Sequence, residues 1–240
     1  MRTETPPPAP PAPWLYLGLD LGQAQDYSAL AVAARDRPPQ EGGTSWRYDA
    51  RGRPSPVAPT VAPPASYALN WLRRWPLKTS YPAIVADVAA LVGQLAARTP
   101  RPRLALVVDA TGVGRPVTDL LRRERLPGGL VEVTITGGDA ATRDGMAWRV
   151  PKRDLVSTVQ VLLQGQRLAI ASALPDAATL TRELLAFQVQ INPATAHDSY
   201  GAWREGAHDD LVLAAALAVW YGEHEPPPRP PPPPTIGIRR

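Results

Sequence analysis

The sequence contains no cysteine, which excludes disulfide bonds and thiolate metal sites. It also lacks a long hydrophobic run: the longest apolar segment, residues 211–221, is too short to cross a bilayer. The first residues lack the charged start and apolar centre of a secretory signal. These absences predict a soluble cytoplasmic protein with no membrane partner.

Proline is abundant, with 30 residues, and it is unevenly spread along the chain. Residues 6–13 read "PPPAPPAP" and residues 226–234 read "PPPRPPPPP", compositions typical of extended polyproline arms. We therefore expect proline-rich tails at 1–13 and 223–240 around a single domain at 14–222, with an irregular Pro/Gly-rich insertion at 36–64. The net charge of +4 permits a polyanionic partner without requiring one.

Hydrophobic patterning predicts an α/β domain. The periodicities indicate strands at 14–20, 28–36, 66–75, 103–112, 130–138 and 167–170, with a further short strand near 46–48. Helical spacing covers 81–98, 152–164, 176–187 and 207–222, and Pro116 fits the first turn of another helix. Strands followed by strand–helix alternation indicate a mixed β-sheet flanked by helices.

Aspartates fall at the ends of the predicted elements. Asp20 ends the first strand, Asp109 ends the buried strand of 103–112, and Asp209 and Asp210 begin the last helix. Carboxylates at the ends of adjacent strands converge at one edge of an open α/β sheet, and Asp26 in the following turn could join them. Their mutual repulsion would raise their pKa values, and a divalent cation would relieve it. Oxygen ligands favour Mg²⁺ or Mn²⁺, and two such ions about 3.5–4 Å apart can promote phosphodiester hydrolysis.

Each acid also has an ordinary structural interpretation. An aspartate at a strand end is often a turn residue, and one at a helix start is often a cap that gains from the helix dipole. The complete set, in this order and on these elements, favours the metal site.

Four segments together resemble the nuclease domain of the large terminase subunits of tailed bacteriophages. They are "LGLDLGQAQDYSALAV", "LVVDATGVGRPVTDLL", "VPKRDLVSTVQVLLQGQRLAI" and "GAWREGAHDDLVLAAALAVW". The resemblance implies a ribonuclease H-like fold and a nuclease that cuts concatemeric viral DNA during packaging. It implies that Asp20, Asp109 and Asp209 bind the metal ions, with Asp26 and Asp210 as auxiliary ligands or close neighbours. The implied partners are double-stranded DNA and a separate packaging ATPase, portal protein or small terminase subunit, in the host cytoplasm.

One departure from that family concerns the ATPase. A large terminase subunit carries an N-terminal ATPase with a phosphate-binding loop, whereas this sequence has no G-x-x-x-x-G-K-[ST] motif and 13 residues before its first predicted strand. We therefore expect a stand-alone nuclease module.

Basic residues near 148–154 are candidates for DNA binding. Lys152 is expected to face the acids or the scissile phosphate, and Arg149 and Arg153 to hold the DNA backbone through salt-sensitive phosphate contacts. Arg143 lies in a glycine-flanked segment predicted to be a loop that could close over DNA. The alternative for all four residues is an ordinary cationic surface.

Other functions remain open at this level. A Holliday-junction resolvase or a ribonuclease H could use the same acids on the same fold. An ATPase of the sugar-kinase and actin class also begins with a strand ending in Asp-x-Gly, although a second such strand is not evident. A third alternative is a non-catalytic packaging scaffold that binds partners through its proline-rich arms.

Overall fold

A computed structural model describes residues 14–22, 26–36, 45–48, 54–57, 64–98, 103–111, 114–190 and 209–225. The strands are β1 (Trp14–Asp20), β2 (Ala29–Arg35), β3 (Ser45–Tyr48), β4 (Pro54–Val57), β5 (Tyr67–Arg74), β6 (Arg103–Asp109), β7 (Gly129–Thr136), β8 (Thr142–Asp144), β9 (Ala147–Pro151) and β10 (Leu168–Ile170). The helices are α1 (Tyr81–Arg98), α2 (Gly114–Arg123), α3 (Lys152–Gln164), α4 (Ala177–Gln190) and α5 (Asp210–His224). Both predicted proline-rich segments, 6–13 and 226–234, lie outside the described residues.

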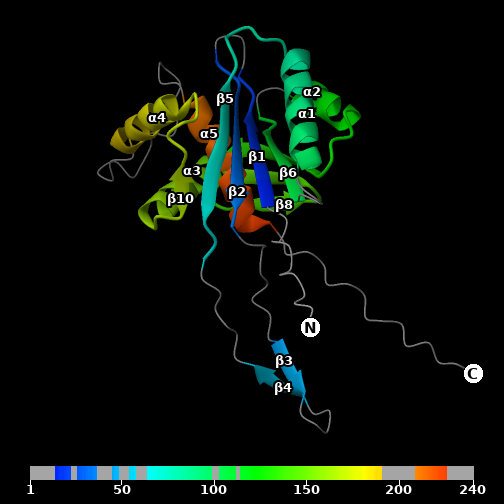
Figure 1. Ribbon diagram of the computed structural model, residues 1–240, viewed down its shortest axis with the longest axis vertical. Helices are drawn as coiled ribbons and strands as arrows, with labels where there is room; N and C mark the ends of the chain where they lie inside the picture. The colour runs from blue at the N-terminus through cyan, green and yellow to red at the C-terminus, as the bar shows by residue number, and fades with distance from the viewer. Residues whose placement is uncertain are drawn as a thin grey trace, which may run out of the picture.

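Eight strands form one mixed sheet in the order β10-β5-β2-β1-β6-β7-β9-β8. The central strands β1, β6, β7 and β9 run parallel, while β2 runs antiparallel to both β1 and β5. Helices α1 and α2 lie on one side of the sheet, and α3, α4 and α5 lie on the other (Figure 1). The α/β architecture predicted from the sequence, a mixed sheet between helices, is confirmed.

Alternation along the central strands divides the core into two layers. On β1, Leu15, Leu17 and Leu19 join the core beneath α1 and α2, whereas Trp14 and Tyr16 join the core beneath α5. Strand β2 sends Leu30 and Val32 toward α1, and it sends alanines 29, 31 and 33 toward α5. Because successive strand residues point to opposite faces, strands with both faces apolar must be covered on both sides.

Helix α5 packs closely on the centre of the sheet. All residues from Asp210 to Gly222 are buried, and four of them are alanines, at positions 214, 215, 216 and 218. A Cβ atom added to Gly18 of β1 would lie 1.9 Å from the Ala214 carbonyl oxygen, so any larger residue there would push the helix away. Small residues on both partners therefore fix the depth at which α5 sits, and α5 carries the predicted acids at its start.

Two predictions about elements were wrong. Residues 137–145 were expected to form a loop, but Thr142–Asp144 is a strand, β8, which pairs with Ala147–Pro151, β9, around Gly145, whose φ is +60°. The proline-rich insertion was expected to hold only one short strand, but its described parts pair as β3 and β4 in a separate two-stranded sheet. In the insertion, pairing with a partner strand outweighed the poor strand propensity of proline. Between β8 and β9, Gly145 lies in the turn, where its positive φ suits glycine. No helix in the described ranges has the length and apolar character needed to traverse a bilayer.

Candidate active site

The ends of β1 and β6 bring two acids side by side. These strands pair in parallel, with Leu19 opposite Val108, and the next residue on each strand is an aspartate, Asp20 or Asp109. Leu19 and Val108 both point into the core beneath α1. Strand alternation therefore directs Asp20 and Asp109 toward the opposite side, where α5 lies.

Asp209 and Asp210 enter from the start of α5. Asp209 occupies the N-cap position, but its side chain makes no capping hydrogen bond. Its Oδ2 instead lies 3.4 Å from the Nζ of Lys152, the first residue of α3. Asp210 is the first residue of the helix and is 5% exposed. The start of α3 and the start of α5 thus meet beside the carboxyl ends of β1 and β6.

The electrostatics of the acids show that they are close enough to affect one another. Burial raises the pKa of Asp20 well above its usual range, and the charges of Asp109, Asp210 and Asp209 raise it further. Burial likewise raises the pKa values of Asp109 and Asp209. The Lys152 ammonium lowers all three. The site is a group of buried and half-buried acids beside Lys152, an arrangement typical of functional sites.

Asp109 also has the turn role that its position suggested. Its Oδ1 accepts hydrogen bonds from the backbone N–H of Thr111, at 2.8 Å, and from the Thr111 hydroxyl. The Thr111 Oγ1 in turn accepts the N–H of Ile135 on β7, at 2.7 Å. Asp109 is therefore held by Thr111, which is itself bonded to β7, and Thr111 is a supporting residue that the sequence did not single out.

The donor set suits a hard divalent cation, since it consists of carboxylate oxygens. Across the described ranges, however, no three acidic or histidine side chains already converge tightly enough to enclose one ion. Binding would therefore require the carboxylates to rotate and the Lys152 ammonium to move away from Asp209. An incoming cation would relieve the repulsion around Asp20, which supplies a reason for that rearrangement.

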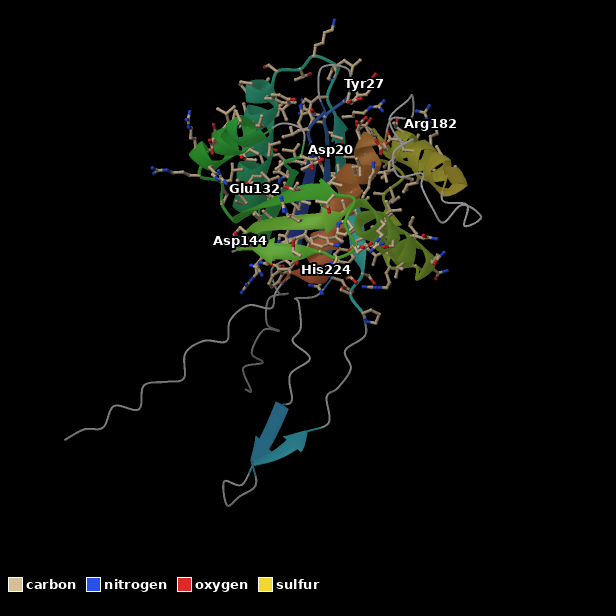
Figure 2. All side chains as sticks on the ribbon, turned by 180° about the vertical axis from the view of Figure 1, so that it is seen from behind. Asp20, Tyr27, Glu132, Asp144, Arg182 and His224 are labelled. Carbon is tan, nitrogen blue, oxygen red and sulfur yellow. The ribbon has the colours of Figure 1, made fainter. Side chains whose placement is uncertain are left out.

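The remaining predicted residues are spread more widely. Asp26 is exposed in the turn after β1, and its charge contributes to the raised pKa of Asp209. Arg153 follows Lys152, and its guanidinium pairs with Asp139 at 3.1 Å. Figure 2 shows the site from behind, with Asp20 inside the body and Tyr27 at the outer end of the β1–β2 turn.

The structure does not bring Arg149 and Arg143 into this group. Arg149 alternates with the core residue Val150 on β9, so it lies on the sheet face opposite α5 and is exposed. Arg143 lies on β8, where its guanidinium carbon is 5.2 Å from the centre of the Trp148 ring. Arg143 thus lies on a strand rather than on the loop expected for it.

Glu183 of α4 is a buried residue at this site that sequence reasoning missed. It is 7% exposed, and its Oε2 accepts hydrogen bonds from the backbone N–H groups of Leu211 and Val212, at 3.0 and 3.2 Å. Burial raises its pKa to about 7, and the charge of Asp210 adds to the increase. A signal was present, since Ala177, Leu180 and Glu183 form a buried stripe of helical spacing that places an acid at a core position.

Comparison with solved structures identifies the fold. The large terminase of bacteriophage HK97 aligns with 89% of this chain and 40% of its own length, with a TM-score of 0.50 and 15% identity. The fold is ribonuclease H-like. The chain thus corresponds to less than half of the HK97 protein.

Two further structures align with lower scores. The Mn-soaked human cytomegalovirus terminase nuclease domain gives a TM-score of 0.46 at 12% identity, over 87% of this chain and 84% of that chain. Thermus thermophilus RuvC gives a TM-score of 0.33 at 12% identity, over 89% and 98%. No protein-family model and no curated protein matches the sequence. The resemblance predicted from the sequence is confirmed at the level of the fold.

Proposed function

We propose that this ribonuclease H-like chain is a metal-dependent endonuclease that hydrolyses phosphodiester bonds of double-stranded DNA. The observation that carries the proposal is the meeting of Asp20, Asp109 and Asp209 at one edge of the sheet, with Lys152 set against them. Burying several like charges is costly unless a positive partner compensates them. The Lys152 ammonium offsets part of that cost, and divalent cations would offset the rest.

Each residue has a distinct role in this proposal. Asp20, Asp109 and Asp209 hold the cations, and Asp26 and Asp210 are auxiliary ligands or close neighbours. Bound divalent cations of this class activate a water molecule and stabilise the leaving oxygen of a phosphodiester. In the metal-free protein, the Lys152 ammonium offsets the negative charge of the acids. Once a cation displaces this ammonium from Asp209, Lys152 would contact the phosphate of the substrate. Contacts of Arg149, Arg153 and Arg143 with the DNA backbone stay predictions.

The terminase assignment is a narrower proposal. The four sequence segments and the fold shared with the HK97 large terminase support a role in cutting concatemeric viral DNA, beside a separate ATPase, portal protein or small terminase subunit. The host cytoplasm is the corresponding location. Substrate shape is a separate question, because junction resolvases and ribonucleases H use the same kind of acidic site.

Cleavage of supercoiled plasmid tests the proposal. Wild-type protein with Mn²⁺ or Mg²⁺ is expected to nick or linearise the plasmid, and EDTA is expected to abolish cleavage. Asp109→Ala is expected to be inactive while Asp144→Ala, an exposed aspartate on β8, cuts like the wild type. Parallel reactions with a linear duplex, a four-way junction and an RNA–DNA hybrid identify the preferred substrate. A folded wild-type protein that is inactive on every substrate with either metal would refute the nuclease assignment.

A further inference from the structure

The start of α5 has an unusual source of capping. The first N–H groups of a helix have no partner within the helix, and a buried helix end needs acceptors for them. An N-cap aspartate ordinarily accepts the second or third N–H of its own helix. Here those two groups belong to Leu211 and Val212, and both donate to Oε2 of Glu183 from α4. The capping carboxylate thus comes from another helix, 28 and 29 residues away in sequence.

The other oxygen of Glu183 is also bonded. Its Oε1 accepts a hydrogen bond from Nη1 of Arg74, at 3.2 Å, in an ion pair whose side chains are 23% and 6% exposed. The backbone N–H of Arg74 donates to Oδ2 of Asp176, just before α4, at 3.1 Å. Strand β5, α4 and the start of α5 are therefore tied together through the side chain of Glu183.

Arg74 extends this connection to the turn after β1. Its guanidinium carbon lies 4.3 Å from the centre of the Tyr27 ring, a distance suited to a cation–π interaction. Tyr27 is adjacent to Asp26 and belongs to the turn that follows Asp20. Glu183 and Arg74 therefore contact two of the segments that carry the acids, the start of α5 and the turn after β1. Neither residue is itself one of those acids.

The geometry points to Glu183 as a positioning residue that holds the start of α5, and with it Asp209, in place relative to Asp20 and Asp109. The inference rests on the proposed function, because it concerns the affinity of that acidic site for divalent cations. Both Glu183 oxygens are already bonded to donors of the protein, so Glu183 is not proposed as a metal ligand. Its effect passes through the position of the helix, and small displacements of site groups have large effects on their function.

Glu183→Gln is the decisive variant. The substitution preserves size, but the side-chain NH₂ group must face either the Arg74 guanidinium or the two N–H groups of α5, where a donor meets donors. We expect Mn²⁺ binding to the full chain, measured by calorimetry without DNA at about pH 8, where Glu183 is ionised, to weaken about tenfold. That is the lower end of the losses seen when supporting contacts of metal sites are removed. Amide hydrogen exchange at Leu211 and Val212 is expected to accelerate in the same variant, independently of metal.

Val88→Ala provides the matched control. Val88 is fully buried in the core beneath α1, on the other side of the sheet from Glu183, so the variant lowers stability without touching α4 or α5. Wild-type Mn²⁺ affinity in Val88→Ala, with weakened affinity in Glu183→Gln, supports positioning. Equal weakening in both variants would show that only general stability matters and would overturn the inference.

Mn²⁺ binding by the wild type separates failure of the positioning role from failure of the metal site. If the wild type binds Mn²⁺ and Glu183→Gln binds it equally well, the positioning role is wrong while the metal site stands. If the wild type binds no Mn²⁺, the metal site itself is wrong, and the inference falls with it. If Glu183→Gln does not fold, Arg74→Lys takes its place, since it keeps the charge but loses the reach of the guanidinium. A several-fold weaker Mn²⁺ affinity is then expected, and unchanged affinity would overturn the inference.

Discussion

The raised pKa of Glu183 predicts an unusual dependence of stability on pH. Burial raises this pKa from 4.5 to about 7, and Asp210 contributes to the increase while Arg74 and the α5 N–H groups oppose it. Between those two pH values the folded protein holds a proton that the unfolded chain has released. The contribution of Glu183 to the free energy of unfolding is therefore greatest below pH 4.5 and decreases as the pH rises to about 7.

The magnitude follows from the two pKa values. At about 1.4 kcal/mol per pH unit, Glu183 contributes a loss of roughly 2–3 kcal/mol in the free energy of unfolding between about pH 5 and pH 8. The raised pKa values of Asp20, Asp109 and Asp209 act in the same direction. In the absence of metal, the wild type is therefore expected to be more stable in mild acid than at neutral pH.

Urea unfolding in EDTA at several pH values between about 5 and 8 measures this effect. Over that range the free energy of unfolding of Glu183→Gln is expected to fall by roughly 2–3 kcal/mol less than that of the wild type, because its amide does not titrate. Val88→Ala retains Glu183 and is expected to keep the wild-type slope at lower overall stability. A wild type whose stability stays constant or rises with pH, or a Glu183→Gln slope equal to that of the wild type, would contradict the reasoning.

Three further predictions concern the site and the packing of α5. Asp20→Asn is expected to raise the metal-free stability measured by urea unfolding, because it removes a buried like charge, and to lower plasmid cleavage by more than about 100-fold, since metal ligation supplies several kcal/mol. Equal cleavage would show that Asp20 is not a ligand. Lys152→Met is expected to bind Mn²⁺ more tightly in calorimetry, because no ammonium then competes for Asp209; weaker binding would contradict that competition. Gly18→Ala is expected to lower the free energy of unfolding by roughly 1–3 kcal/mol, because the new Cβ atom would collide with the α5 backbone. An unchanged urea unfolding curve would mean that α5 tolerates displacement.

The acids could be predicted from the sequence because their positions depend on local rules. Strand alternation and the parallel pairing of β1 with β6 are sufficient to place Asp20 beside Asp109. Leu211 to Tyr221 is apolar on every face, which indicates a helix buried on all sides, and its start carries the acid pair. These inferences need periodicity and strand order, and no knowledge of individual side-chain contacts.

The contacts that support the acids could not be predicted in the same way. Glu183 meets Leu211 only because α4 packs beside α5, and no periodicity relates their positions. Arg74 meets Glu183 across 109 residues of sequence, through the placement of β5 near the edge of the sheet. The β8–β9 pair was missed for a similar reason, because its strands are short, largely exposed and held by pairing rather than by an apolar pattern.

The role of Glu183 also bears on why Asp209, rather than a residue deeper in α5, faces Lys152. An aspartate at the N-cap position would normally turn back to its own helix and accept the N–H groups of the second and third residues. Glu183 already accepts both of those groups, so capping no longer requires Asp209. Its carboxylate can then extend toward Lys152 and the ends of β1 and β6. Two neighbouring acids at a buried helix start are compatible with folding here because the structural task of the first has been transferred to α4.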